Sequence, residues 1–235
     1  MPITIEQSVG EIAVEFSGSI PFFESKGIDY CCGGKHSLKD ACLSKGLDPA
    51  TVAAELGAKA ADREKVPGTD WQKAPLAGLI DHILAKHHTY TREQTALVAR
   101  LAEKVARVHG DRHPFLAELR DLVFAIGSEL DDHLHKEEQV LFPMLRKLEA
   151  AGDQAPKNPV LTGPVRVMMS EHEAVGAQLA RVRQLTGDLT PPDDACNSFR
   201  ALYSGLADLE ADLHLHIHLE NNVLFARAGA LGWAD

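Results

Sequence analysis

Three long stretches of this 235-residue chain carry residues at spacings of three and four positions that are mostly apolar, and a fourth stretch, the first in the chain, does so less regularly. That spacing places the apolar side chains on one face of a helix and predicts four helices that pack as a bundle. Each seam is interrupted by a histidine or glutamate, where a bundle core normally has an apolar side chain. The seams are Leu79, Ile83, His88, Val98, Leu101 and Val105; Phe115, Leu119, Leu122, Ile126, Glu129, His133, Glu137, Val140 and Met144; Val165, Met168, His172, Val175, Leu179 and Val182; and Phe199, Leu202, Leu206, Leu209, Leu213, His216, Glu220 and Val223.

Breaks in this pattern divide the chain into two parts. Residues 1–60 contain only short helical patterns around a glycine-bearing turn, and a polar stretch with Pro and Gly at 61–73 predicts a linker. Residues 74–230 hold the four long stretches, which are separated by segments rich in Gly, Pro and Asp. The sequence therefore predicts an all-α protein, with a small N-terminal helical domain and an antiparallel four-helix bundle.

Charge and hydropathy exclude several classes of function. The formal net charge of −10 argues against nucleic acid or an anionic membrane as the main partner. No run of apolar residues is long enough to predict a membrane-spanning helix, and the N-terminal segment lacks the basic start of a signal peptide. Four cysteines in a chain of this length do not form a disulfide scaffold. We therefore expect a cytoplasmic protein that binds neither nucleic acid nor membranes.

An internal repeat relates the second and fourth helices. The motif His-x-x-x-Glu-x-x-Val-Leu-Phe begins at His133 and recurs 83 residues later at His216. A seam histidine precedes each copy, His88 by 45 residues and His172 by 44. The bundle is therefore predicted to consist of two similar helical hairpins, each with one lone histidine and one His-x-x-x-Glu pair.

The spacing of each pair has a chemical meaning. Residues four apart on a helix lie on one face, so each pair points an imidazole and a carboxylate into the same volume. Two such pairs that face each other in a bundle core are typical of carboxylate-bridged dinuclear sites. Imidazole with carboxylate favours non-haem iron, with manganese as the alternative, whereas structural zinc favours thiolates. The alternative is that these are core histidines that only form hydrogen bonds. Against it, burial of two unpaired carboxylates would cost roughly several kcal/mol of folding free energy each unless a cation neutralised them.

The segment 213–219 allows a second interpretation, because its histidines alternate with apolar residues as in a β-strand. The unbroken seam through this segment favours a helix, and so does the repeat, whose first copy does not alternate. On a helix His214 and His218 turn away from His216, and we expect them on the surface. The same holds for His135.

A fifth histidine makes the two halves unequal. His109 follows His88 by 21 residues, and the equivalent position after His172 is Asp193. Spacing ranks His109 only modestly above three competing histidines. With His109 included, seven protein ligands would leave about one open position on a bridged pair of metals, which suggests binding or chemistry rather than scaffolding. The competitors are His82, His87 and His113.

Two acidic residues occupy equivalent places in the repeat. Glu129 and Asp212 each lie four residues before a seam histidine. They are candidates for acceptors that orient the imidazoles of His133 and His216. The alternative is that they are ordinary polar positions of the bundle.

Adjacent cysteines form a separate signal at Cys31 and Cys32. An unstrained disulfide between neighbouring residues is difficult, because its geometry distorts the intervening peptide. The following glycines allow a turn, and Lys35 would favour a thiolate. One interpretation is a mobile redox or iron-passing pair that visits the metal site, and the other is a turn with buried thiols. Cys42 and Cys196 are interpreted as structural.

The bundle motifs, together with DYCCGGK at 29–35, closely resemble the iron–sulfur cluster repair di-iron proteins of the RIC family, also called the ScdA/YtfE type. The resemblance covers nearly the whole chain and includes HKEEQVLFP and HLENNVLF of a hemerythrin-like bundle. It implies two non-haem iron ions per chain, with an oxo bridge between them. Carried over residue by residue, the family's ligands are His88, His109, His133, Glu137, His172, His216 and Glu220.

The resemblance also implies a role in nitrosative and oxidative stress. Proteins of this family repair damaged iron–sulfur clusters in the cytoplasm, react with nitric oxide at the di-iron centre and are commonly dimers. We therefore expect damaged iron–sulfur proteins as partners and nitric oxide or dioxygen as small ligands. We also expect a homodimer, and a protein that is not a conventional turnover enzyme. The alternatives are a carrier or sensor of nitric oxide or dioxygen without repair activity, and an enzyme that reduces nitric oxide.

Overall fold

The computed structural model describes residues 3–61, 69–152 and 161–230, and within these ranges the regular structure is helical. The predicted all-α fold is confirmed. Most of the predicted linker lies outside the described residues. None of the helices in the described ranges is long and apolar enough to span a membrane.

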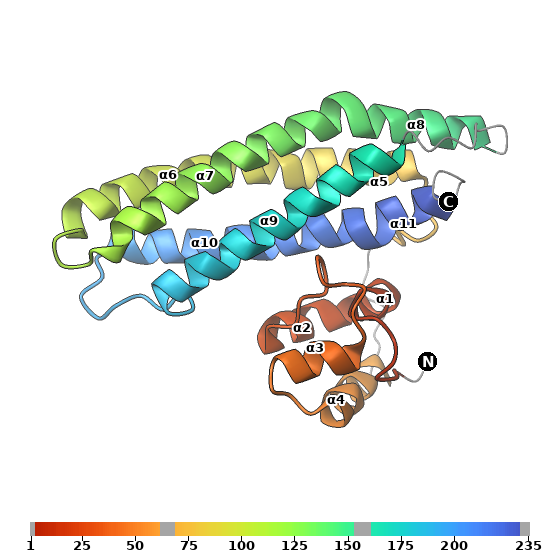
Figure 1. Ribbon diagram of the computed structural model, residues 1–235, viewed down its shortest axis with the longest axis horizontal. Coiled ribbons are helices and arrows are strands. Elements are labelled where there is room, and N and C mark those ends of the chain that lie inside the picture. Colours follow the sequence, from red (N-terminus) through yellow and green to blue (C-terminus); the bar gives the residue numbers. More distant parts are fainter. Residues whose placement is uncertain (1–2, 62–68, 153–160, 231–235) are drawn as a thin grey trace.

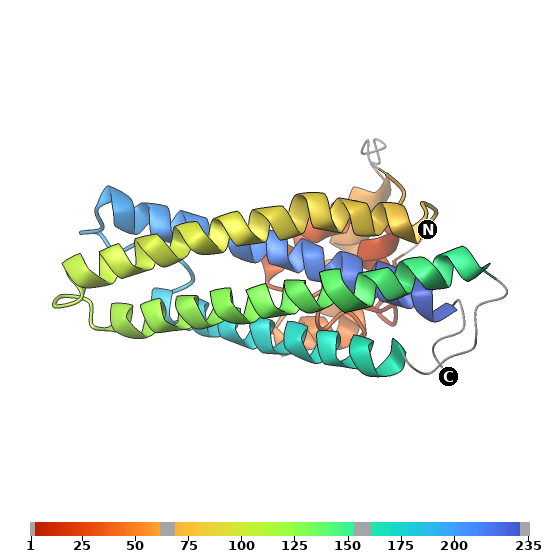
Figure 2. The same ribbon diagram turned by 90° about the horizontal axis from the view of Figure 1, so that it is seen from above.

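Four antiparallel helical rods form the bundle (Figures 1 and 2). Three of the rods contain a π-helical segment, labelled η, between α-helical segments. The first rod is α5 (Leu76–His82), η2 (Ile83–His88) and α6 (Thr89–His109), and the second is α7 (Phe115–Lys136), η3 (Glu137–Leu141) and α8 (Phe142–Ala151). The third is α9 (Thr162–Thr186), and the fourth is α10 (Asn197–His218), η6 (Leu219–Leu224) and α11 (Phe225–Ala228).

The buried stripes follow the predicted seams closely in α9 and α10, where every predicted seam residue is buried. The second rod differs. Glu129 is exposed and Val140 is half exposed, whereas Leu130 and Leu141 are buried. A π-helical turn holds one residue more than an α-helical turn, so the buried position after Glu137 moves from Val140 to Leu141.

The polar seam residues lie between two apolar clusters of the bundle core. One cluster gathers Leu79, Leu141 and Val223 with their neighbours at the end of the bundle that holds α5, α8 and α11. The other gathers side chains such as Val98 and Leu206 along α6, α7, α9 and α10. The polar layer is therefore enclosed by apolar packing on both sides.

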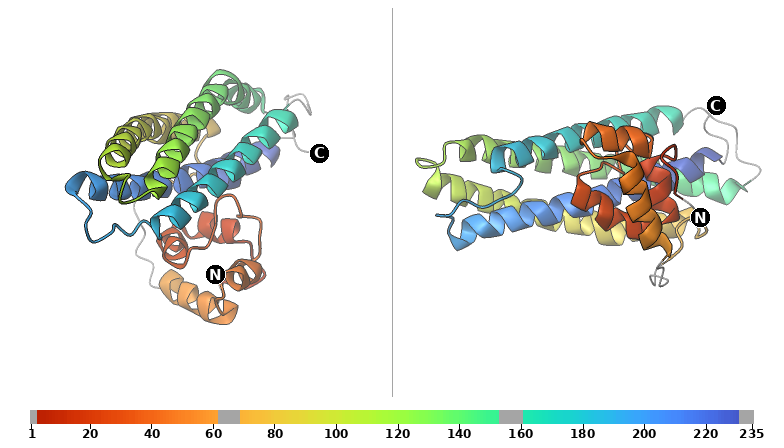
Figure 3. Two further views of the ribbon diagram at one scale, coloured as in Figure 1. Left: turned by 60° about the vertical axis from the view of Figure 1, so that its left-hand side comes forward. Right: turned by 90° about the horizontal axis from the view of Figure 1, so that it is seen from below.

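The N-terminal domain is a group of short helices. They are α1 (Val9–Glu15), η1 (Ser17–Ser19), α2 (Ile20–Lys26), α3 (Leu38–Ser44) and α4 (Pro49–Ala61). Ser8 and Glu11 form a capping box at the start of α1. The domain core includes Ile217 of the bundle, and the domain packs beneath α9 and α10 (Figure 3).

Candidate metal centre

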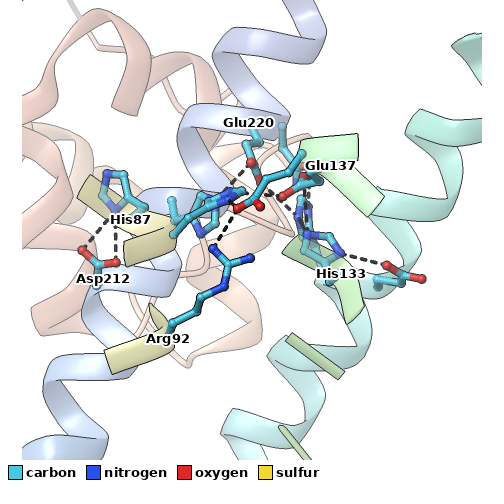
Figure 4. Close-up of polar contacts among 12 residues, drawn as sticks. His87, Arg92, His133, Glu137, Asp212 and Glu220 are labelled. Atoms are coloured by element: carbon cyan, nitrogen blue, oxygen red, sulfur yellow. Dashed lines mark hydrogen bonds and ion pairs between the residues drawn. The ribbon is translucent and has the colours of Figure 1, made fainter. Parts of the chain in front are cut away.

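Six of the seven predicted ligands come together in the buried polar layer. They form two groups of four, and both glutamates belong to both groups. Figure 4 shows Glu137 and Glu220 pointing toward one another from different helices. The six residues are His88, His133, Glu137, His172, His216 and Glu220.

Each glutamate offers one oxygen to each group. Glu137 lies 3.4 Å from the Nε2 atom of His88 through Oε2, and 3.5 Å from the Nε2 atom of His133 through Oε1. Glu220 lies 3.0 Å from Nε2 of His216 through Oε1, and 3.2 Å from Nε2 of His172 through Oε2. This is the arrangement in which two carboxylates bridge two cations, each held also by two imidazoles.

The π-helical segments coincide with this site. The segment η2 ends at His88, η3 begins at Glu137, and η6 contains Glu220. Such bulges change the direction of side chains that follow an α-helical turn, and they are frequent at functional sites. Here they place ligand candidates from three rods at one depth of the bundle.

Three of the four imidazoles are oriented by hydrogen bonds on their Nδ1 atoms. The Nδ1 atom of His88 is 2.8 Å from Glu138, that of His133 is 2.8 Å from Glu171, and that of His172 is 3.0 Å from Asn221 Oδ1. These contacts leave each Nε2 atom directed at the glutamates. Occupying one ring nitrogen in this way is how proteins fix the tautomer and direction of a metal-binding histidine.

Two cations at the surface balance these outer carboxylates. Arg92 donates to Glu138 over 2.8 Å, and Lys136 donates to Glu171. Both pairs are partly exposed, so they contribute little to stability by themselves. Their effect is to fix the position of the acceptors behind His88 and His133.

The predicted acceptors Glu129 and Asp212 serve other partners. Glu129 accepts a hydrogen bond from Gln178, and Asp212 lies 3.0 Å from the Nδ1 atom of His87. The His87 ring stacks on His216 with ring centres 5.4 Å apart, so Asp212 supports that ligand through a ring contact. Of the two interpretations of these acids, the one in which they bond the imidazoles of His133 and His216 directly does not hold.

The three observed acceptors share a simple sequence signal that the repeat did not reveal. Glu138, Glu171 and Asn221 each lie directly beside a site residue in the chain. A neighbour in sequence turns about 100° around its own helix, so it faces the adjacent rod and meets a different imidazole. Which acceptor meets which imidazole therefore depends on which rods are adjacent in the bundle.

Two buried carboxylates lie next to imidazoles in this site, and their interaction shifts the pKa values of both glutamates and of His133. Burial and the charge of Glu220 act to raise the pKa of Glu137, but His133 and His88 outweigh them and hold that pKa below its ordinary value. Burial acts on Glu220 too, and its histidine neighbours hold its pKa well below the ordinary value. Burial would lower the pKa of His133, yet the two glutamates raise it to about 9. The charges of His133 and of the two glutamates thus stabilise one another.

The donor set fits a pair of cations. Both glutamates are fully buried, and among the described residues no hydrogen bond reaches either oxygen of Glu137 or the Oε2 atom of Glu220. Unpartnered buried carboxylate oxygens are costly unless a cation neutralises them. Nitrogen and carboxylate donors without thiolates suit iron or manganese better than structural zinc.

The seventh predicted ligand, His109, is not part of this cluster. It lies at the opposite end of α6 from His88, about 30 Å away at the rise of an α-helix. Its Nε2 atom is 3.2 Å from the Sγ atom of Cys196. Periodicity identified the buried face of α6 correctly, but 21 residues of one continuous helix put His109 too far from His88 to share a metal site, and the assignment of His109 to that site is corrected.

The segment that holds the vicinal cysteines docks beside the cluster. The Cys32 thiol lies 3.4 Å from the backbone oxygen of His172, and Asn222 Nδ2 donates to the backbone oxygen of Tyr30 over 3.0 Å. A Cβ atom at Gly34 would lie 2.6 Å from Asn222 Oδ1, so this close approach requires glycine. The structure thus brings both predicted cysteines next to a ligand-bearing helix.

The environment of Cys31 disfavours the thiolate. Its hydrogen bond with Cys32, its burial and the charge of Asp29 raise the pKa of the Cys31 thiol well above its ordinary value. Lys35 is exposed, and the expectation that it favours a thiolate is not met at Cys31. All four cysteines are free.

Docking of this domain also changes the surroundings of two histidines predicted at the surface. His218 is buried, and its ring centre lies 5.5 Å from that of Tyr30. His214 lies 2.8 Å from Glu24 of α2. Both turn away from the metal cluster as predicted, but they meet the N-terminal domain instead of solvent. His135 is exposed, as expected.

A small cavity of about 10 Å³ adjoins three of the site histidines. This is on the order of the room that one water molecule needs. Apolar side chains form the rest of its wall. The lining residues are Leu130, His133, His172, Val175, Leu213, His216 and Ile217.

Comparisons with known proteins agree with this geometry. Residues 79–228 match the Hemerythrin HHE cation binding domain, and residues 5–60 match a family described as a domain of unknown function, DUF542. Among similar proteins are the iron–sulfur cluster repair proteins YtfE of Yersinia pseudotuberculosis serotype O:1b (strain IP 31758) and Yersinia pestis (strain Pestoides F). Each is 43% identical over 222 residues, which cover 94% of this chain and 96% of the relative. The chain therefore belongs to the family of YtfE-type iron–sulfur cluster repair proteins and carries a hemerythrin-type cation-binding domain.

Proposed function

We propose that this protein acts in the response to nitrosative and oxidative stress, donating iron to damaged iron–sulfur clusters and reacting with nitric oxide at a di-iron centre. One observation carries the proposal: Glu137 and Glu220 each present one oxygen to each of two histidine pairs. The similarity to the iron–sulfur cluster repair proteins of Yersinia supports the repair role. The target is a damaged iron–sulfur protein, and the proposed setting is the cytoplasm, with the protein as a homodimer.

Two iron ions, with an oxygen bridge between them, are the proposed cofactor. Bound there, iron would supply both a ligand site for nitric oxide and exchangeable metal for a damaged cluster. Six protein ligands leave one more position open than the seven predicted from the sequence. A site with more open positions suits exchange with small ligands better than a closed structural site does.

Residues around the proposed metal ligands orient the imidazoles and form a small cavity. Glu138, Glu171 and Asn221 orient three imidazoles, and Leu130 and Val175 line the cavity beside them. This cavity is the proposed place at which a small ligand such as nitric oxide or dioxygen reaches the site histidines.

Cys31 and Cys32 are proposed to assist in passing iron. The Cys32 thiol already lies against His172, and the two sulfur atoms are 4.0 Å apart. Asp29 completes a group of three donor atoms close enough to share a metal ion. Iron that leaves the centre on the His172 side would meet this group first.

A second candidate function is a carrier or sensor of nitric oxide or dioxygen without repair activity. The observation that favours it is the small cavity of about 10 Å³ beside His133, His172 and His216, whose remaining wall is apolar. Reduction of nitric oxide at the same site is a further enzymatic alternative, and it needs electrons from an external donor.

The first test is iron content per chain with an absorption spectrum, followed by a repair assay of a nitrosylated cluster protein. Replacing both vicinal cysteines with serine (Cys31→Ser, Cys32→Ser) separates the candidates. Loss of repair with unchanged iron content and nitric oxide binding supports the proposed role of the cysteines. Repair at the wild-type rate would remove the cysteines from the function, and absence of repair activity in the wild type would favour the carrier.

A further inference from the structure

A thiol and an imidazole meet at the end of the bundle remote from the metal centre. His109 ends α6 and Cys196 precedes α10, and these two ends lie on the same side of the molecule, beside the loop that joins α6 to α7 (Figures 1 and 2). The Nε2 atom of His109 lies 3.2 Å from the Sγ atom of Cys196. None of the six metal-site residues is involved in this pair.

The two partners differ in exposure in a way that suits reactivity. His109 is 94% buried, since its exposed fraction is 6%, whereas Cys196 is exposed. The Nδ1 atom of His109 is buried and has no hydrogen-bond partner among the described residues. Ring contacts with Phe199, at 5.5 Å between centres, hold the imidazole in place. A fixed imidazole therefore faces a thiol that solvent can reach.

The position of Cys196 at the start of α10 is a second feature that suits a reactive thiol. Cys196 is the N-cap residue of the 22-residue helix α10, and its side chain makes no capping hydrogen bond. The N-terminus of a helix carries partial positive charge, which stabilises a thiolate. The thiol is therefore free for chemistry instead of being used to cap the helix.

Charged side chains lie around the loop that precedes Cys196. The carboxylate of Asp194 is engaged by Arg112 at 3.3 Å and by His113 at 3.1 Å. Arg200 donates to the backbone oxygen of Asp193 over 3.4 Å and so places its guanidinium at the same loop. The carboxylate of Asp194, two residues before Cys196, is thus already paired with other side chains.

The other cysteines provide a contrast within the same chain. Cys31 and Cys42 are buried, and their pKa values are raised above the ordinary value, for Cys31 by the hydrogen bond with Cys32 and for Cys42 by burial. Cys32 is half-buried against α9. Cys196 differs from these three because it combines exposure with an imidazole partner.

We propose that Cys196 is a reactive thiol, with His109 as its base, that exchanges with low-molecular-weight disulfides. The Cys196 proton passes to the Nε2 atom of His109, and the thiolate attacks one sulfur of the small disulfide. The bond between the two sulfurs of that disulfide breaks as the new Cys196 disulfide forms. The other half leaves as a thiolate and takes the proton from His109, so the disulfide supplied is the oxidant and no other reagent is needed. The site is separate from the proposed metal function and does not depend on it.

The test is the rate at which the folded, metal-loaded protein reacts with 5,5′-dithiobis(2-nitrobenzoate), followed by the release of the coloured thiolate. The wild type is expected to show one fast phase that is missing in Cys196→Ser. In His109→Gln the fast phase should slow on the order of tenfold or more, because the base is lost. His135→Gln, which alters an exposed histidine on another helix, is the matched control and should react like the wild type.

A second measurement keeps the proposal testable if His109→Gln does not fold. The rate of Cys196 in the folded wild type is compared with that of the same thiol in the urea-unfolded chain. Faster reaction in the folded state supports activation by the fold, and mass spectrometry after incubation with oxidised glutathione should place the adduct on Cys196. A folded-state rate equal to or below the unfolded one, or an unchanged rate in folded His109→Gln, overturns the proposal.

Discussion

The two copies of the His-x-x-x-Glu repeat have the same chemistry but different surroundings. In the first copy, His133 is held by Glu171, and a surface lysine balances that acid. In the second copy, the Nδ1 atom of His216 has no hydrogen-bond partner among the described residues, and the ring of His87 stacks on the imidazole instead. The candidate metal ligands are thus the same in both copies, whereas the residues that hold their imidazoles in place differ.

The difference follows from what covers each copy. Glu138 and Glu171 around the first copy are partly exposed and paired with cations. The second copy is covered by the N-terminal domain, where Asn221 and Asn222 meet the backbone of the cysteine segment. One copy is therefore supported by charge at the surface, and the other by a docked domain that carries two thiols.

The largest expected effect comes from removing a shared ligand. Because each glutamate serves both histidine pairs, Glu137→Ala or Glu220→Ala should abolish binding of both metals, from about two ions per chain to nearly none. Metal analysis with an absorption spectrum measures this. Glu129→Ala removes an exposed carboxylate of the same helix and should retain both metals. Loss of only one ion in either glutamate variant would contradict the shared arrangement.

Metal binding is expected to release protons at neutral pH. The pKa of His133 is raised to about 9 in the absence of metal, so its imidazole is protonated at pH 7 and must lose that proton to bind a cation. Affinity should therefore rise with pH up to about 9 and fall by up to about tenfold per unit below it for each proton displaced. Calorimetric titration at pH 7 in two buffers of different ionisation enthalpy measures the proton count. A count of zero would be incompatible with protonated imidazoles in the metal-free site.

Breaking the outer support should have an intermediate effect. Glu171→Gln and Asn221→Ala each remove a partner of one ligand imidazole, and such changes typically cost about 10–100-fold in metal affinity. Competition with a chelator measures the loss. Glu173→Gln changes an exposed acid two residues along the same helix and is the control for Glu171. Equal affinity in all three variants would mean that packing alone orients the imidazoles.

A smaller effect is expected at the domain contact that distinguishes the second copy. Asn222→Ala removes the hydrogen bond to Tyr30 and should weaken docking by about 1 kcal/mol, or roughly fivefold in the open population. Hydrogen exchange of residues 29–35 should increase, with little change in the bundle. Asn197→Ala, at the other end of the fourth rod, is the control. Unchanged exchange would show that Asn222 does not hold the segment.

The smallest expected effect concerns His109, which the sequence analysis assigned wrongly to the metal site. His109→Gln should leave iron content and the absorption spectrum unchanged, because His109 lies about 30 Å along the helix from His88. The comparison variant is His88→Gln, which should lose metal. Loss of iron from a folded His109 variant would restore His109 to the metal site.

Local periodicity determined most of the fold and the inner site. A helix repeats every 3.6 residues, so spacing alone assigned His172 and His216 to buried seams and paired His133 with Glu137. The repeat indicated that two such pairs would face each other. These inferences needed no knowledge of neighbouring helices, because the relevant residues share one face of their own helix.

Only the tertiary structure decided the supports and the cover of the site. The rise of a helix already separates His109 from His88, but no spacing predicted the π-helical turn that moved the buried stripe from Val140 to Leu141. The acceptor behind an imidazole belongs to an adjacent rod, as Glu171 does for His133. Spacing along one helix carries no information about which residue of another helix lies opposite, and that information arises only when the helices and the N-terminal domain pack together.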